Sequence, residues 1–153
     1  MRSSLKLALA VATTAATIFG GSALASGAHG GGSQVPANCG TGTATVSTDA
    51  PLSLWPPNHK QHTFTVTYSG GATGDILSTT TTSSDGNGVV GDSAPATVGS
   101  PASDVSTQST VVASRPGTSK TGRTYTMTYT VTGSNGCTGT FAVTVPHDRR
   151  KAK

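Results

Sequence analysis

Polar and apolar side chains alternate most regularly over residues 123–145, near the end of the chain. A period of two places the two sets on opposite faces of a β-strand, and threonine, which fills most of the polar positions, suits a solvated face. Residues 133–136 read G-S-N-G, and Asn135-Gly136 is a strong hairpin signal. We therefore expect an antiparallel hairpin whose apolar face, with Tyr125, Tyr129 and Phe141, is covered by a second layer.

Shorter segments of the same kind precede this hairpin and are separated by turn residues. We expect strands at residues 41–47, 62–68, 75–82 and 110–114. Residues 83–109 are expected to form either a long loop or two short edge strands, near 96–98 and 105–107. No segment has a helical period. The sequence thus predicts an all-β domain at residues 39–148, folded as an immunoglobulin-like antiparallel β-sandwich of about seven strands.

The two ends of the chain differ in composition from this domain. Residues 1–25 combine the basic Arg2 and Lys6, an apolar run and an A-L-A site, which is the layout of a secretory signal peptide. The apolar run is shorter than the roughly 20 residues of a membrane span. Residues 26–38 form a flexible Gly-rich lead and residues 149–153 a basic tail. We expect a secreted, extracellular protein in contact with the cell wall, without a membrane span.

The formal net charge of +4 comes from the ends of the chain. Between Ser26 and Asp148, four basic residues stand against six aspartates, so the domain itself is mildly acidic. It has no basic patch interleaved with aromatic residues, which argues against nucleic-acid binding.

Two cysteines, Cys39 and Cys137, flank the predicted domain. In an exported chain a single pair of cysteines favours a disulfide. This bond would enclose nearly the whole domain and, for a loop of about 100 residues, contribute about 4–5 kcal/mol in the chain-entropy model.

Trp55 is the only tryptophan, and it lies in the segment L-S-L-W-P-P-N-H-K at residues 52–60. Pro56 and Pro57 cannot donate to a strand ladder, so the segment is expected to be a loop. Trp55 is expected to anchor the core beneath the sheet; the alternative is an exposed platform on which a sugar ring stacks.

Three motifs together resemble immunoglobulin-like, hyalin-repeat-like modules of bacterial secreted and surface proteins. They are S-L-W-P-P-N-H-K at 53–60, the G-R-x-Y-x-M-x-Y-x-V strand at 122–131, and V-P-H-D at 145–148. The resemblance implies a spacer or adhesive unit without known catalysis. It also implies structural roles for the residues of the motifs: Trp55, Pro56, Pro57, Asn58, His59, Lys60, Tyr125, Tyr129, His147 and Asp148. One such role is a clasp between His59 in the early loop and His147 at the chain end.

A weak calcium loop is the first candidate site, with oxygen ligands from Asp85, Asn87 and Asp92. The family often has a more acidic loop here, so the default is a plain polar loop and no cofactor. His59 and His62 lie three apart, and on a strand they point to opposite faces, which disfavours a shared transition metal.

Hydrolysis has little support in the sequence. His59, Asp75 and Ser93 occur in the order of a serine-protease triad, but Ala94 and Pro95 follow the serine where an oxyanion hole needs backbone N–H donors.

The sequence therefore favours a non-catalytic module with a binding, adhesive or structural role, acting through threonine-rich faces on an unknown extracellular ligand or cell-wall polymer. The alternatives are a small metal-dependent hydrolase using His59, His62, His147 and Asp92, or a secreted inhibitor with a protruding loop at 115–122.

Overall fold

The computed structural model describes residues 34–118 and 120–147. The predicted signal peptide, most of the Gly-rich lead, Asp148 and the basic tail lie outside these residues. The described part forms nine strands and no helix. The strands are β1 (Ala37–Asn38), β2 (Thr45–Thr48), β3 (Gln61–Ser69), β4 (Ile76–Ser83), β5 (Val89–Asp92), β6 (Ala96–Thr97), β7 (Val105–Val112), β8 (Arg123–Thr132) and β9 (Cys137–Val145).

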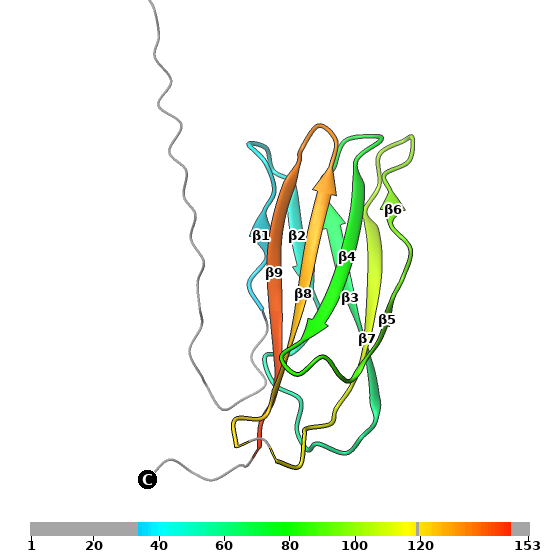
Figure 1. The fold of residues 1–153 in the computed structure, drawn as a ribbon. Helices are drawn as coiled ribbons and strands as arrows, with labels where there is room; N and C mark the ends of the chain where they lie inside the picture. The colour runs from blue at the N-terminus through cyan, green and yellow to red at the C-terminus, as the bar shows by residue number, and fades with distance from the viewer. Residues whose placement is uncertain (1–33, 119, 148–153) are drawn as a thin grey trace, which may run out of the picture.

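The strands form two antiparallel sheets that pack as the two layers of a β-sandwich (Figure 1). One sheet has the order β1-β2-β3-β7-β5 and the other β6-β4-β8-β9. The predicted all-β, two-layer architecture is therefore confirmed. The strand number differs from the expected seven because β1, with two residues, and β5 at the sheet edge are also formed, whereas β6 lies at the short edge strand expected near 96–98.

The terminal hairpin has the predicted arrangement. β8 and β9 pair in register, with Met127 opposite Phe141. Tyr125 is fully buried, and Tyr129 and Phe141 are each 4% exposed beneath the facing sheet. The tilted rings of Tyr129 and Phe141 lie 5.2 Å apart, within the range of a favourable aromatic pair.

The region before this hairpin departs from the expected strands. Residues 105–107 and 110–114, expected as separate strands, belong to the single strand β7, and β5 was not expected at all. The cause is that the inward positions of β7 include Thr107 and Ser109, which break the apolar alternation on which the prediction relied.

These inward hydroxyls are paired across the sandwich. The Thr79 and Thr107 hydroxyls lie 2.6 Å apart, and those of Thr81 and Ser109 lie 2.7 Å apart. Each pair joins β4 of one sheet to β7 of the other, so both hydroxyls are satisfied without water. The part of the core between β4 and β7 is therefore held by hydrogen bonds as well as by apolar contact.

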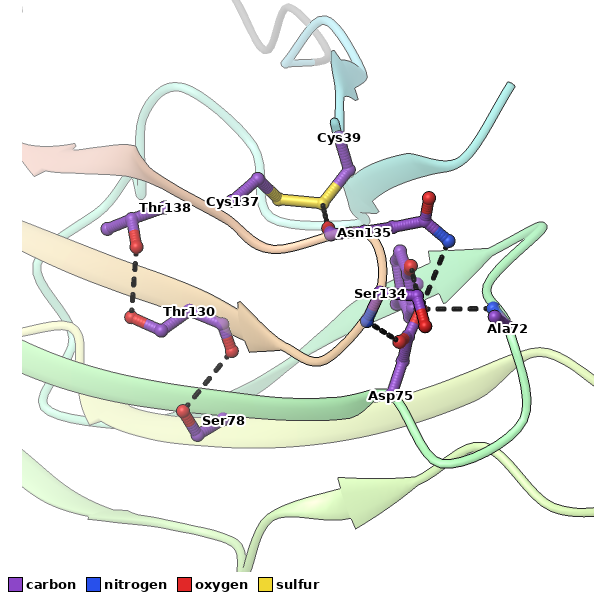
Figure 2. The surroundings of a disulfide bond; sticks show 10 residues. Cys39, Ala72, Asp75, Ser78, Thr130, Ser134, Asn135, Cys137 and Thr138 are labelled. Atoms are coloured by element: carbon purple, nitrogen blue, oxygen red, sulfur yellow. Dashed lines mark hydrogen bonds between the residues drawn. A yellow bond between two sulfur atoms is a disulfide. The ribbon is translucent and has the colours of Figure 1, made fainter. Parts of the chain in front are cut away.

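The predicted disulfide between Cys39 and Cys137 is present, with the two Cα atoms 5.3 Å apart (Figure 2). It ties the chain just after β1 to the start of β9, across a sequence separation of 98. Most of the sandwich lies within the loop that it closes.

A buried carboxylate lies beside this disulfide. Asp75 has no exposed surface and accepts hydrogen bonds from the Tyr68 hydroxyl at 2.8 Å and the Ala72 N–H at 3.0 Å. The Ser134 N–H at 2.7 Å and the Asn135 side chain at 3.2 Å complete the set (Figure 2). Burial raises the pKa of Asp75, but the four hydrogen bonds outweigh it and hold the pKa below its ordinary value.

The tight turn after β8 depends on this carboxylate. Gly133 has a φ of 126°, and a Cβ at this position would collide with the side chain of Asp75. Asp75 therefore holds together the end of β3, the 70–75 loop and the β8–β9 turn.

Trp55 does not anchor the core. It is 37% exposed, whereas the preceding Leu54 is 5% exposed. The N–H of Leu54 donates to the Thr144 carbonyl at 2.9 Å, so this segment is extended beside β9. Since adjacent side chains of an extended segment point in opposite directions, Leu54 enters the core and Trp55 turns outward. This corrects the sequence-based expectation for Trp55.

Candidate functional site

The outer face of the sheet formed by β4, β8 and β9 is almost uniformly hydroxylated. We call it the threonine face. Its outward positions are Ile76, Ser78, Thr80 and Thr82 on β4, Thr124, Thr126, Thr128, Thr130 and Thr132 on β8, and Thr138, Thr140, Ala142 and Thr144 on β9. None of these side chains carries a charge.

Strand pairing arranges these residues in rows. One row runs Thr80, Thr128, Thr140 and the next runs Ser78, Thr130, Thr138. Figure 2 shows the second row, in which the Thr138 hydroxyl donates to that of Thr130 at 3.4 Å. Neighbouring strands are about 4.8 Å apart and alternate residues along a strand about 6.7 Å apart, so the hydroxyls form a two-dimensional repeat.

Some hydroxyls on the outer faces of the two sheets pair with one another, and others do not. On the sheet that contains β3 and β7, the Thr63 and Thr110 hydroxyls pair at 2.9 Å, and those of Thr67 and Ser106 at 3.1 Å. On the threonine face, the hydroxyls of Thr80, Thr126, Thr128 and Thr140 make no hydrogen bond within residues 34–118 and 120–147. A hydroxyl both donates and accepts, so these groups can bind an external ligand.

The L-W-P-P-N-H-K segment forms the loop between β2 and β3, as expected. Its end is fixed through the backbone, because the His59 N–H donates to the Ala113 carbonyl at 3.0 Å and the Ala113 N–H donates to the Lys60 carbonyl at 2.8 Å. The Asn58 side chain caps the turn by accepting from the Lys60 N–H at 3.0 Å. His59 has a φ of 59°, a left-handed conformation that is uncommon for residues other than glycine.

Backbone hydrogen bonds join the β2–β3 loop to the end of β9. Besides the bond from Leu54, the Thr144 N–H donates to the Leu52 carbonyl at 3.0 Å. These bonds do not involve the side chains of His59 and His147, so the clasp expected between the two histidines stays a prediction.

The carboxylates of the expected calcium loop point to different partners. The Asp85 carboxylate accepts from the Arg123 guanidinium at 2.7 Å, and this hydrogen bond is the main reason that its pKa lies below the ordinary value. Asp92 accepts from the backbone N–H of Thr81 at 2.7 Å, and its other oxygen lies 2.6 and 2.5 Å from the hydroxyls of Thr81 and Ser109. These two hydroxyls have two protons for the three contacts that they make with each other and with Asp92. Both aspartates therefore stabilise the fold.

Asn87 completes the turn that begins at Asp85. Its side chain donates to the Asp85 carbonyl at 2.9 Å, and its backbone N–H donates to the Asp85 carboxylate at 3.2 Å. The loop is therefore arranged by its own hydrogen bonds, as expected of a plain polar turn.

The ion pair between Arg123 and Asp85 belongs to a wider cluster that sequence reasoning missed. The guanidinium of Arg123, only 5% exposed as a residue, also donates to the Ser114 hydroxyl at 2.5 Å and to the Tyr125 hydroxyl at 3.1 Å. Tyr125 in turn donates to the Val112 carbonyl at 2.6 Å. This cluster joins β8 to the end of β7 and leaves Arg123 satisfied inside the protein.

The residues considered for hydrolysis are not brought together. His59 precedes the start of β3 and Asp75 follows its far end, so a nine-residue strand separates them. Ser93 lies in an open depression over β5 and β7 that no histidine lines. Within the described ranges, no three His, Cys, Asp or Glu side chains gather to hold a metal ion.

No protein-family model, curated protein or solved structure matches this chain. In the part of the chain that the structure describes, no helix has the length and apolarity needed to cross a membrane.

Proposed function

We propose that this chain is an exported, non-catalytic, immunoglobulin-like module that binds a neutral polysaccharide through its threonine face. The observation that carries the proposal is the uncharged array of threonines, in which several hydroxyls have no partner within the described residues. A neutral, regularly repeating polymer matches this array, because threonine supplies donors, acceptors and methyl groups at regular intervals but no charge.

The strand order supports the immunoglobulin-like assignment. In that fold the first, second and fifth main strands are neighbours in one sheet, while the third, sixth and seventh form the other. Here β2, β3 and β7 are neighbours in one sheet and β4, β8 and β9 in the other. The resemblance of the three sequence motifs to hyalin-repeat-like modules points in the same direction.

The disulfide supports export. Bonds of this kind persist in oxidising compartments and are rare in the cytosol. Cys39, one of its two residues, has no exposed surface. Secretion also agrees with the sequence features of residues 1–25.

The test is retention of the purified protein on insoluble neutral polysaccharides, namely cellulose, chitin and xylan. A Thr128→Val/Thr140→Val variant removes two hydroxyls in one row of the threonine face and preserves side-chain shape and β-branching. The matched control, Thr63→Val/Thr110→Val, makes the same change on the opposite sheet.

We expect wild type and control to be retained on at least one polymer, and the Thr128→Val/Thr140→Val variant to bind about tenfold more weakly, which equals about 1.4 kcal/mol. Equal retention of both variants, or no retention of the wild type on any of the three polymers, would overturn the proposal.

A further inference from the structure

The basic side chains of the described residues lie at one end of the sandwich. We call this the cationic end and define it by Lys60, Arg115, Lys120 and Arg123. Lys60 ends the β2–β3 loop, Arg115 and Lys120 lie in the β7–β8 loop, and Arg123 begins β8. In Figure 1 both loops lie at the same end of the molecule, where β9 finishes.

Backbone contacts confirm that these segments are neighbours. Lys60 pairs through its carbonyl with the N–H of Ala113, two residues before Arg115. Gly122 lies against Val145 and His147, so closely that a Cβ there would collide with the Val145 carbonyl. The cationic end therefore brings together three parts of the chain that are far apart in sequence.

The distribution of charge at this end is one-sided. Asp85 is the only carboxylate of the described residues that lies there, and Arg123 neutralises it. Lys60 and Lys120 are exposed and Arg115 is half-buried, and none of the three makes an ion pair within residues 34–118 and 120–147. The other described aspartates, Asp49, Asp75, Asp92 and Asp104, lie elsewhere in the fold.

One further feature belongs to the same end. Trp55 is 37% exposed in the β2–β3 loop, one residue after Leu54 bonds to Thr144 near the end of β9.

We propose that the cationic end binds an acidic polysaccharide. The uncompensated cations attract a polyanion, because like charges gathered on one surface raise the local concentration of an oppositely charged ligand. The exposed part of Trp55, 37% of its surface, favours a saccharide among polyanions, because sugar rings stack on aromatic side chains. The cationic end adjoins the threonine face at Thr124 and Thr144, but this proposal does not depend on the function proposed for that face.

The experiment titrates the full exported chain with polygalacturonate, with dextran as the neutral control polymer and polyphosphate as a polyanion without sugar rings. The emission of Trp55, the only tryptophan, reports directly on its environment. The test variant is Lys60→Gln/Arg115→Gln/Lys120→Gln. The matched control, Thr41→Asp/Thr43→Asp/Ser103→Asp, changes the net charge by the same amount in exposed loops at the disulfide end.

We expect polygalacturonate to bind with a change in Trp55 emission and to be released by salt, since exposed charges are screened within about 10 Å at 0.1 M ionic strength. The Gln variant should bind about tenfold more weakly, or about 1.4 kcal/mol, while the Asp control stays close to wild type. Dextran should not bind.

Three outcomes would overturn the proposal. Equal weakening by the Gln and Asp variants would show that only net charge matters. Polyphosphate binding as tight as that of polygalacturonate, without a change in Trp55 emission, would refute a saccharide site. Loss of binding on neutralising residues 149–153 but not Lys60, Arg115 and Lys120 would assign the binding to the tail alone.

Discussion

The buried carboxylate of Asp75 offers the sharpest test of how this fold is held together. Asparagine at this position has the same shape but only one acceptor oxygen. With that oxygen in place of Oδ2, the bonds from Tyr68, Ala72 and Asn135 are kept, but the new amide group faces the Ser134 N–H, which is also a donor. The opposite orientation loses the bonds from Ala72 and Asn135, because only the Tyr68 hydroxyl can accept from the amide group.

The cost can be worked from these bonds. A hydrogen bond to a charged group contributes about 1.5–3 kcal/mol, and the bonds that survive in the Asp75→Asn variant lose their charge assistance. We expect a loss of about 2–4 kcal/mol in the free energy of unfolding. At about 4 °C per kcal/mol for a domain of this size, the Tm should fall by about 8–16 °C.

The dependence of the free energy of unfolding on pH is a second test of the role of Asp75. Because the pKa of Asp75 is lowered in the folded protein, its contribution to stability is present above the pKa of the unfolded carboxyl, about 3.9, and is lost as the pH falls through the folded pKa. The Asp75→Asn variant should therefore lose less stability than wild type below about pH 4.

Urea unfolding of the oxidised protein, at neutral and acid pH, measures both effects. Asp104→Asn is the control, because Asp104 is exposed and accepts a single bond, from Ser69 at 2.9 Å; its cost should be below about 0.5 kcal/mol. An Asp75→Asn variant as stable as this control would refute the role assigned to the buried carboxylate.

Two further predictions concern the links within the sandwich. Replacing Cys39 and Cys137 by serine should reduce the free energy of unfolding by about 4–5 kcal/mol in the chain-entropy model, and a loss below about 1 kcal/mol would contradict that model. The wild-type protein should show no free thiol on alkylation. Thr107→Val should cost about 1–3 kcal/mol because it leaves the buried Thr79 hydroxyl without its partner, whereas Thr79→Val/Thr107→Val should recover most of that loss. A double-mutant cycle without coupling would argue against the pair.

The sequence by itself determined the strands whose inward residues are apolar. The alternation in β3, β8 and β9 predicted which side chains are buried, because the period of a strand is a local property. The cysteine pair was also predictable, since an exported chain with two cysteines favours their pairing. The threonine face follows from the same alternation, as the outward set of β8 and β9.

Only the tertiary structure decided how polar residues are used inside the protein. Thr107 and Ser109 point inward because β4 supplies hydroxyl partners across the sandwich, and no local pattern reveals such a partner. Asp75 is buried because donors from three separate segments converge on it, and Trp55 faces outward because Leu54 pairs with a strand some 90 residues later. The cationic end likewise exists only because folding brings two loops together. These outcomes depend on contacts between distant parts of the chain, which the period of the sequence does not encode.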